Sequence, residues 1–220
     1  VSARKLRVTA FGAGQIRAKV LVIGCIHGTE CAGTAIADRI VSLGCPPTDA
    51  DIWLVPDLNP DGHRLGVRVN SRGVDLNRNF GGGWRPIGTR GDPQYSGSRP
   101  FSEPETRAAR HLIQRVKPAV TIWYHQGQGP LVRAWGGSIP VARDYARRAG
   151  LPFRRMRWPA GTAPHWQNQA HPGTSSFVVE LPDGRLSQRA TERQARAVLG
   201  LARNQREQPA GVGGSAPEGR

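Results

Sequence analysis

The sequence predicts an α/β fold, a doubly wound and mostly parallel mixed sheet with helices on both faces. Apolar runs of strand length are the first observation, because they are typical of strands buried on both faces. These runs cover residues 20–26, 51–58, 119–124 and 175–181. The second observation is that segments with helical spacing of apolar residues lie between the runs. A chain of 220 residues with 38% hydrophobic content is also large enough for one compact domain.

The N-terminal part should contain two strands and a helix. Residues 4–11 alternate loosely between apolar and polar side chains, so we expect an edge strand that forms a hairpin with the run 16–26 through a turn at residues 12–14. The helix that follows should end at Gly44, ahead of two prolines. Its apolar residues recur near helical spacing: Ala32, Ala35, Ile36 and Ile40.

The central segment, residues 59–100, is rich in Gly, Asn, Arg and Pro and shows no clear period. A structureless segment of this length is rare unless it is functional. Ser102 and Glu105 have the spacing of a capping box, with Ser102 as N-cap, and predict a helix to about Val116. The remaining elements are predicted in order: a strand over 119–124, a helix over 140–149, a strand over 153–157, a strand over 175–181 and a helix over 186–203.

We expect a single domain over residues 1–207. Residues 208–220 are rich in Gly, Pro, Ala and Ser and should form a disordered tail outside the fold. The cysteines Cys25, Cys31 and Cys45 lack the regular spacing of a disulfide scaffold, and at most one bridge can form within the chain. Small buried hydrophobic side chains are the favoured interpretation of Cys25 and Cys31, with a disulfide or a thiol ligand as the alternatives.

Composition limits the classes of function. The formal net charge is +15, and nearly all the basic residues are arginines that are spread along the chain. A nucleic-acid-binding protein would show a basic stripe or motif, so no nucleic acid partner is expected. The arginine bias instead indicates a base-composition preference of the genome together with a generally cationic surface, and a polyanionic environment such as a cell wall is equally compatible. No run of about 18 apolar residues exists, so no membrane span is expected.

Four side chains at strand ends point to metal-assisted hydrolysis. His27 and Glu30 follow the run 20–26 directly, at the carboxyl edge where open α/β sheets bind ligands. His125 and Glu180 stand at the ends of two later strands, so all four groups can converge. His27, Glu30 and His125 can hold a zinc ion, and Glu180 can act as general base on a water molecule. The alternative for Glu180 is a structural carboxylate paired with an arginine.

Three motifs in the central segment then establish a resemblance. They are Asn59-Pro60-Asp61-Gly62, Arg68-Val69-Asn70, and the stretch from Gly73 to Phe80 that reads GVDLNRNF. With the His-x-x-Glu pair, the later histidine and Glu180 in the same order, the chain resembles the M14-type zinc carboxypeptidases over about residues 20–182. The resemblance implies one Zn²⁺ per chain on His27, Glu30 and His125, the His2Glu set known from carboxypeptidase A.

The resemblance also implies roles for the motif residues. Arg78, with Asn77 beside it, would bind the free carboxylate of the substrate, as a bidentate guanidinium is suited to do. Arg68 would stabilise the oxyanion of the tetrahedral intermediate. Asp75 and Asn79 are expected to be supporting residues that brace the turn and cap the segment. For Arg68 and Arg78 the alternative is a solvated surface arginine.

The short spacing between the motifs is similar to that of the bacterial murein peptide amidases of this family. Those enzymes cleave the bond between γ-D-glutamate and meso-diaminopimelate, which bears carboxylates on both sides. Arg133 is therefore a candidate second carboxylate anchor, with a plain surface arginine as the alternative. No acid lies near residues 162–165, which disfavours substrates with basic C-terminal side chains. The tyrosine that commonly covers the substrate in the family has no clear match, and Trp158 and His165 are two candidates for its place.

The sequence thus predicts a zinc-dependent hydrolase that acts on small peptides with a free carboxylate, with diaminopimelate-containing wall peptides favoured. Three alternatives stay open: a general metallocarboxypeptidase, an N-acyl amino acid deacylase similar to the desuccinylase and aspartoacylase group, and a non-catalytic module that binds wall peptides. The cationic composition and the start at Val1 in place of an initiator methionine favour a secreted or wall-associated protein over a cytoplasmic one.

Overall fold

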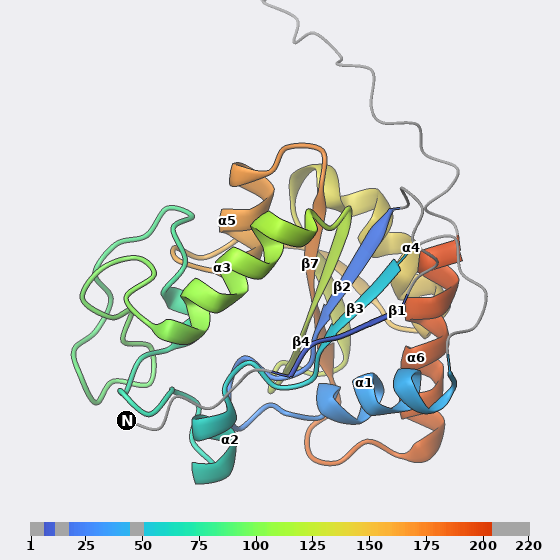
Figure 1. The fold of residues 1–220 in the computed structure, drawn as a ribbon, viewed down its shortest axis with the longest axis horizontal. Coiled ribbons are helices and arrows are strands. Elements are labelled where there is room, and N and C mark those ends of the chain that lie inside the picture. The colour runs from blue at the N-terminus through green and yellow to red at the C-terminus, as the bar shows by residue number, and fades with distance from the viewer. Residues whose placement is uncertain (1–6, 12–17, 45–50, 204–220) are drawn as a thin grey trace, which may run out of the picture.

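The computed structural model describes residues 7–11, 18–44 and 51–203. Within them, seven strands form one mixed sheet in the order β1-β3-β2-β4-β7-β5-β6 (Figure 1). The strands are β1 (Thr9–Phe11), β2 (Lys19–Ile23), β3 (Asp51–Val55), β4 (Val120–Gln126), β5 (Leu131–Ala134), β6 (Phe153–Arg155) and β7 (Ser175–Leu181). Strands β3, β2, β4 and β7 run parallel to one another, whereas β1 and β5 pair antiparallel with β3 and β7.

Helices cover both faces of this sheet, so the predicted doubly wound class is confirmed (Figure 1). Helices α1 (Gly33–Ser42), α4 (Ile139–Ala149) and α6 (Gln188–Arg203) pack on one face, and α3 (Pro104–Val116) and α5 (Ala163–Ala170) on the other. Val20 and Val22 of β2 join the first core, while Leu21 and Ile23 join the second. A strand covered on both sides needs an apolar residue at every position, which explains the uninterrupted runs.

Short helices organise the central segment, although its sequence shows no clear period. They are α2 (Pro60–Leu65) and the 3₁₀ helix η1 (Leu76–Arg78); a further 3₁₀ turn, η2 (Gly136–Ser138), precedes α4. Asn59 caps α2, because its Oδ1 accepts a hydrogen bond from the Gly62 N–H at 3.1 Å. The central segment therefore has regular structure, and a motif residue stabilises the start of one of its helices.

Several predicted elements need correction. The edge strand β1 pairs with β3 instead of forming a hairpin with β2, and the predicted turn at 12–14 lies outside the described residues, as does the predicted tail. The predicted strand over 51–58 ends at Val55, and Ala35 is exposed on α1. Strand β5 and helix α5 were not predicted. No helix among the described residues is long and apolar enough to cross a membrane.

The capping box at the start of α3 was also wrong. Glu103, not Ser102, is the N-cap residue, and Pro104 occupies the first turn. The Ser102 hydroxyl donates to a Glu103 carboxylate oxygen at 2.8 Å. Asn79 takes over the capping role, since its Oδ1 accepts from the Glu103 N–H at 3.2 Å and from the Thr106 hydroxyl at 2.8 Å. Asn79 thus ties the central segment to α3, in line with its predicted supporting role.

Candidate active site

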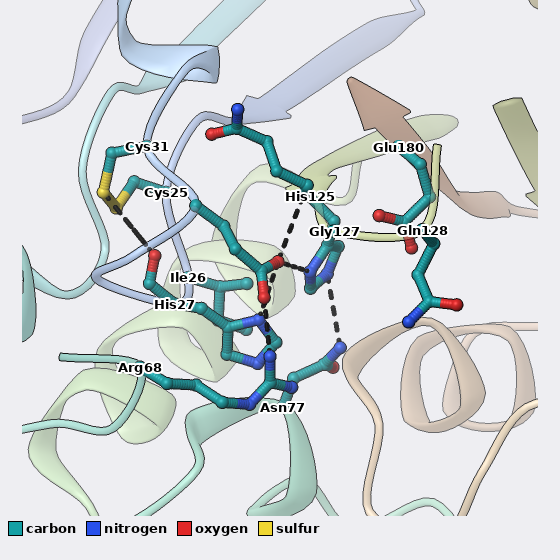
Figure 2. Close-up of polar contacts among 12 residues, drawn as sticks. Cys25, Ile26, His27, Cys31, Arg68, Asn77, His125, Gly127, Gln128 and Glu180 are labelled. Atoms are coloured by element: carbon teal, nitrogen blue, oxygen red, sulfur yellow. Dashed lines mark hydrogen bonds and ion pairs between the residues drawn. A yellow bond between two sulfur atoms is a disulfide. The ribbon is translucent and has the colours of Figure 1, made fainter. Parts of the chain in front are cut away.

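The carboxyl ends of β2, β4 and β7 lie side by side and bring the predicted ligands together. His27 and Glu30 occupy the turn between β2 and α1, and His125 lies near the end of β4. In the register of the sheet, His125 is directly opposite Glu180 of β7. Figure 2 shows the side chains of His27, His125, Arg68 and Asn77 converging at this edge.

The turn after β2 is held by close backbone packing. A Cβ atom on Gly28 would lie 2.1 Å from the Gly62 carbonyl carbon, so a larger residue does not fit. The Gly28 N–H donates to the Arg68 carbonyl at 3.2 Å, and Asn59 Nδ2 donates to the Ile26 carbonyl at 3.2 Å. The Asn59-Pro60-Asp61-Gly62 motif therefore supports the turn that carries His27 and Glu30.

A disulfide joins Cys25 to Cys31 across the same turn (Figure 2). The favoured interpretation of these cysteines as two separate buried hydrophobic side chains was therefore wrong. The turn reverses the chain between β2 and α1, which brings the two Cα atoms to 4.5 Å. His27 and Glu30 both lie inside the ring that the bridge closes.

The three predicted ligands fit a zinc ion. Their donor atoms all lie within 4.8 Å of one another. His27 Nε2 bonds to Asp75 Oδ1 at 2.9 Å, which leaves the Nδ1 lone pair facing Glu30 Oε2 at 3.0 Å without a hydrogen bond among the described residues. Two histidine nitrogens and one carboxylate are a recognised ligand set for a catalytic zinc.

The surroundings of Glu30 keep its carboxyl group ionised, so it can act as an anionic ligand. Burial opposes its ionisation, but the nearby imidazoles of His125 and His27 outweigh this and hold the pKa of the carboxyl well below its usual range. His125 Nδ1 lies 2.9 Å from Glu30 Oε2, and the Gln126 N–H donates to the same oxygen at 3.1 Å. The carboxylate is thus oriented as well as charged.

Arg68 and Asp75 form a second layer around these ligands. Arg68 Nη1 donates to Glu30 Oε1 at 2.6 Å, and its Nε and Nη2 both donate to Asp75 Oδ2 at 3.1 Å. Asp75 braces the turn as predicted, accepting from the Asn77 N–H at 2.8 Å. Its bond to His27 was missed, because sequence spacing does not reveal a contact between residues 48 positions apart. Such a partner fixes the tautomer and orientation of a ligand histidine.

All eight site residues predicted from the sequence line one cavity of about 230 Å³. Arg78 Nη1 donates to the Asn77 carbonyl at 2.8 Å, and burial lowers the pKa of Arg78 while Asp75 opposes that effect. The Asn77 amide already has partners, because its Oδ1 accepts from the Ala163 N–H at 2.9 Å and its Nδ2 lies 3.3 Å from His125 Nε2. Arg78 therefore brings a positive charge to the cavity, whereas the Asn77 amide holds His125 and the Ala163 backbone in place.

Glu180 lies across the cavity in a mostly buried position. Burial raises its pKa to about 7, although the nearby charge of Arg133 acts in the opposite direction. Glu180 Oε1 is 3.5 Å from Arg133 Nη1, and Oε2 is buried without a hydrogen-bond partner among the described residues. A carboxyl group with a pKa near neutrality can both accept and return a proton, as a general base must.

Comparison with known proteins places this site in a family. A family model described as zinc carboxypeptidase matches residues 1–175. The chain belongs to the zinc carboxypeptidase family. Members of this family are zinc-dependent hydrolases, and His27, Glu30 and His125 form a group that could hold such a metal ion.

Murein peptide amidase A from Escherichia coli K12 is 35% identical over 121 residues, which cover 48% of each chain. The protein of that name from Vibrio campbellii is 30% identical over 60% of this chain and 55% of its own length. The chain thus spans about half the length of the curated relatives it matches.

Solved structures share the fold over most of the chain. The murein-tripeptide amidase of Escherichia coli O157 aligns with a TM-score of 0.67 and 25% identity, over 91% of this chain and 86% of that one. Thrombin activatable fibrinolysis inhibitor aligns with a TM-score of 0.74 over 90% of this chain and 66% of that one. At 18% identity, the second comparison shows the fold alone.

The lining of the cavity in this member of the zinc carboxypeptidase family differs in part from expectation. Trp158 lines the cavity, whereas His165 packs against Gly83 and is not among the lining residues. Gln126 and Gln128, which were not predicted as site residues, lie at the cavity as well. Their position directly after His125 was the available signal. The uncharged residues of the lining include Met156, Thr162, Pro164 and Val178. Among the described residues, Glu180 and Glu30 are the only acids that line the cavity.

Proposed function

We propose that this protein is a zinc-dependent amidase that cleaves the bond next to a carboxylate-bearing residue in small peptides, with γ-D-glutamyl-meso-diaminopimelate wall peptides as substrate. The observation that carries the proposal is one cavity that contains the zinc ligand set, the buried Glu180 and three arginines, Arg68, Arg78 and Arg133. A substrate with several carboxylates complements such a cationic cavity. The similarity to a murein-tripeptide amidase supports the same class of substrate.

Each residue has a defined task in this reaction. A zinc ion bound by His27, Glu30 and His125 would supply a Lewis acid and lower the pKa of water. Arg78 holds the free carboxylate of the substrate and so decides which amide bond is presented. Glu180 removes a proton from the attacking water and later delivers it to the leaving amine. Arg68 donates hydrogen bonds to the developing oxyanion once substrate replaces its present contacts.

The proposal includes action outside the cytoplasm. The Cys25–Cys31 bridge supports it, because disulfides persist mainly in oxidising compartments. The net charge of +15 also suits a negatively charged wall.

The test is product analysis with L-Ala-γ-D-Glu-meso-diaminopimelate. Zinc-loaded wild-type protein and the Glu180→Gln variant are incubated with the tripeptide, and products are identified by mass spectrometry after the zinc content has been measured. We expect diaminopimelate to be released by the wild type only. No release from fully zinc-loaded wild type would refute the proposed substrate.

Parallel incubations separate the alternatives. Release of ordinary C-terminal residues would indicate a general metallocarboxypeptidase, and hydrolysis of N-acyl amino acids would indicate a deacylase. Tight binding of the tripeptide by calorimetry, with no turnover of any substrate, would indicate a binding module.

A further inference from the structure

We infer that Arg133, supported by Gln128, is a specificity-determining residue that binds an acidic group at the end of the substrate's C-terminal side chain. The inference rests on the proposed function and deepens it, because it assigns the second carboxylate to a particular part of the substrate. Arg133 then distinguishes a C-terminal residue with a carboxylate-tipped side chain from one with a neutral or amino-tipped side chain.

Arg133 lines the cavity next to Glu180. Arg133 of β5 is the register partner of Val178 of β7, two residues before Glu180. Cross-strand partners lie on the same face of a sheet, and Val178 and Glu180 share that face because they are two residues apart. Arg133 and Val178 both line the cavity.

Residues 161–164 contribute to the cavity lining and are hydrogen-bonded to the motif that contains Arg78. The Phe80 N–H donates to the Gly161 carbonyl at 2.9 Å, and the Ala163 N–H donates to Asn77 Oδ1 at 2.9 Å. Thr162 and Pro164 of this segment line the cavity, as Arg78 does. A residue whose main-chain carboxylate lies on Arg78 therefore has its side chain in the cavity that Arg133 also lines.

The guanidinium of Arg133 has few partners for a buried cation. Its side chain is 12% exposed, yet its Nε is buried without a hydrogen-bond partner among the described residues. Nη2 donates to Gln128 Oε1 at 3.2 Å, and the contact of Nη1 with Glu180 Oε1 is 3.5 Å, which is long for a hydrogen bond. A guanidinium offers five N–H donors, and burying them without acceptors is costly.

Among the described residues that line the cavity, the only carboxylates are Glu180 and the candidate ligand Glu30, which is paired with Arg68. Met156 and Val178 are among the uncharged lining residues. A purely structural arginine would be expected to have a closer carboxylate partner. The geometry instead leaves donors available for a ligand carboxylate, which can form charge-assisted hydrogen bonds with them.

Three tripeptides provide a matched test. L-Lysine is meso-diaminopimelate without its distal carboxylate, and L-norleucine also lacks the amine, so L-Ala-γ-D-Glu peptides ending in the three residues isolate the acidic group. We expect Arg133→Met to lower kcat/KM for the diaminopimelate peptide about 10- to 100-fold, chiefly through KM, and to change kcat/KM for the norleucine peptide much less. Arg133→Lys should restore part of the loss.

Arg154→Met is the matched control. Arg154 is the register partner of Arg133 on β6 but is exposed and is not among the cavity-lining residues, so its removal changes the same net charge outside the site. Its kinetics should match those of the wild type. Equal losses on all three peptides in Arg133→Met would overturn the inference, because they would indicate an effect through Glu180 or through folding.

Binding of the free amino acids keeps the inference testable if the peptides are not hydrolysed. Calorimetric titration of zinc-loaded protein with meso-diaminopimelate and with L-lysine should show preference for the former in wild type and none in Arg133→Met. Equal affinities in the wild type would overturn the assignment of Arg133. Preferential binding without turnover would instead refute the proposed reaction and leave the assignment intact.

Discussion

Asp75 forms hydrogen bonds with two residues of the candidate metal site, His27 and Arg68. One carboxylate oxygen bonds to His27 Nε2 and the other accepts from Arg68, while the carboxylate itself is fully buried. Hydrogen bonds of this kind make a histidine a stronger and better oriented ligand. The affinity for zinc therefore depends on a residue that is not itself a ligand.

We expect Asp75→Asn to weaken zinc binding about 10- to 100-fold, the usual cost of removing such a partner. Competition with a chromophoric chelator measures the change. Asp144→Asn is the control, because Asp144 pairs with Arg148 on α4, away from the cavity, and should leave zinc affinity unaltered. A variant at position 75 with wild-type affinity would contradict the proposed role.

Glu180 makes stability depend on pH in the metal-free protein. Burial raises its pKa from 4.5 to about 7, against the charge of Arg133, so the folded state binds this proton more tightly than the unfolded state. The contribution to stability is complete below the unfolded pKa and is lost as the pH rises through about 7. Urea denaturation of chelator-treated protein should show Glu180→Gln gaining stability relative to wild type as the pH rises across this range. A difference that does not vary with pH would show that Glu180 titrates at its ordinary value.

At the scale of elements, the turn between β2 and α1 is the most constrained part of the site. Its backbone packs directly against α2, with no space for a side chain at Gly28. We expect Gly28→Ala to lower the free energy of unfolding by about 3 kcal/mol, because overpacking against the main chain is not relieved by a rotamer change. Gly137→Ala serves as the control, since a Cβ atom at that position would meet no other atom within 4 Å. Thermal unfolding of both variants measures the contrast.

Individual elements differed in how well their sequences predicted them. Strands β2, β4 and β7 are apolar over most of their length and were predicted, because burial on both faces leaves an unambiguous pattern. Strand β5 has four residues and includes Arg133, so its pattern resembles a loop. Helix α5 contains polar residues that meet the sheet, such as Gln167, whose Nε2 donates to the Thr121 hydroxyl at 2.8 Å. Such internal polar pairs become visible only in the folded structure.

For the whole molecule, the convergence of His27, His125 and Glu180 could be predicted because parallel strands end at one edge. Their order along the chain sufficed for that inference. The pairing of β1 with β3, the Cys25–Cys31 bridge and the contact of Arg133 with Glu180 could not, since each depends on which distant segments become neighbours. The chemistry of the site was thus more predictable than the walls of its cavity.

Zinc should stabilise the whole fold, because its ligands come from the β2–α1 turn and from β4. Binding to the folded state alone contributes about 2.7 kcal/mol when free zinc is about 100 times the dissociation constant. We expect Tm to fall on chelation and to recover with zinc, and His125→Ala to abolish this response. His111→Ala, which removes an exposed histidine of α3, should retain it. A zinc-independent Tm in the wild type would contradict the assigned ligands.

The side-chain amide of Asn77 connects the segment that carries Arg78 to His125 and to the backbone of Ala163. One end contacts the ligand His125 and the other holds the Ala163 backbone, while Arg78 follows Asn77 directly in the chain. These contacts hold the proposed carboxylate anchor at a set distance from the candidate metal ligands. In the proposed reaction the cavity therefore takes one residue beyond the scissile bond, and a peptide extended by a further residue would present the wrong bond to Glu180.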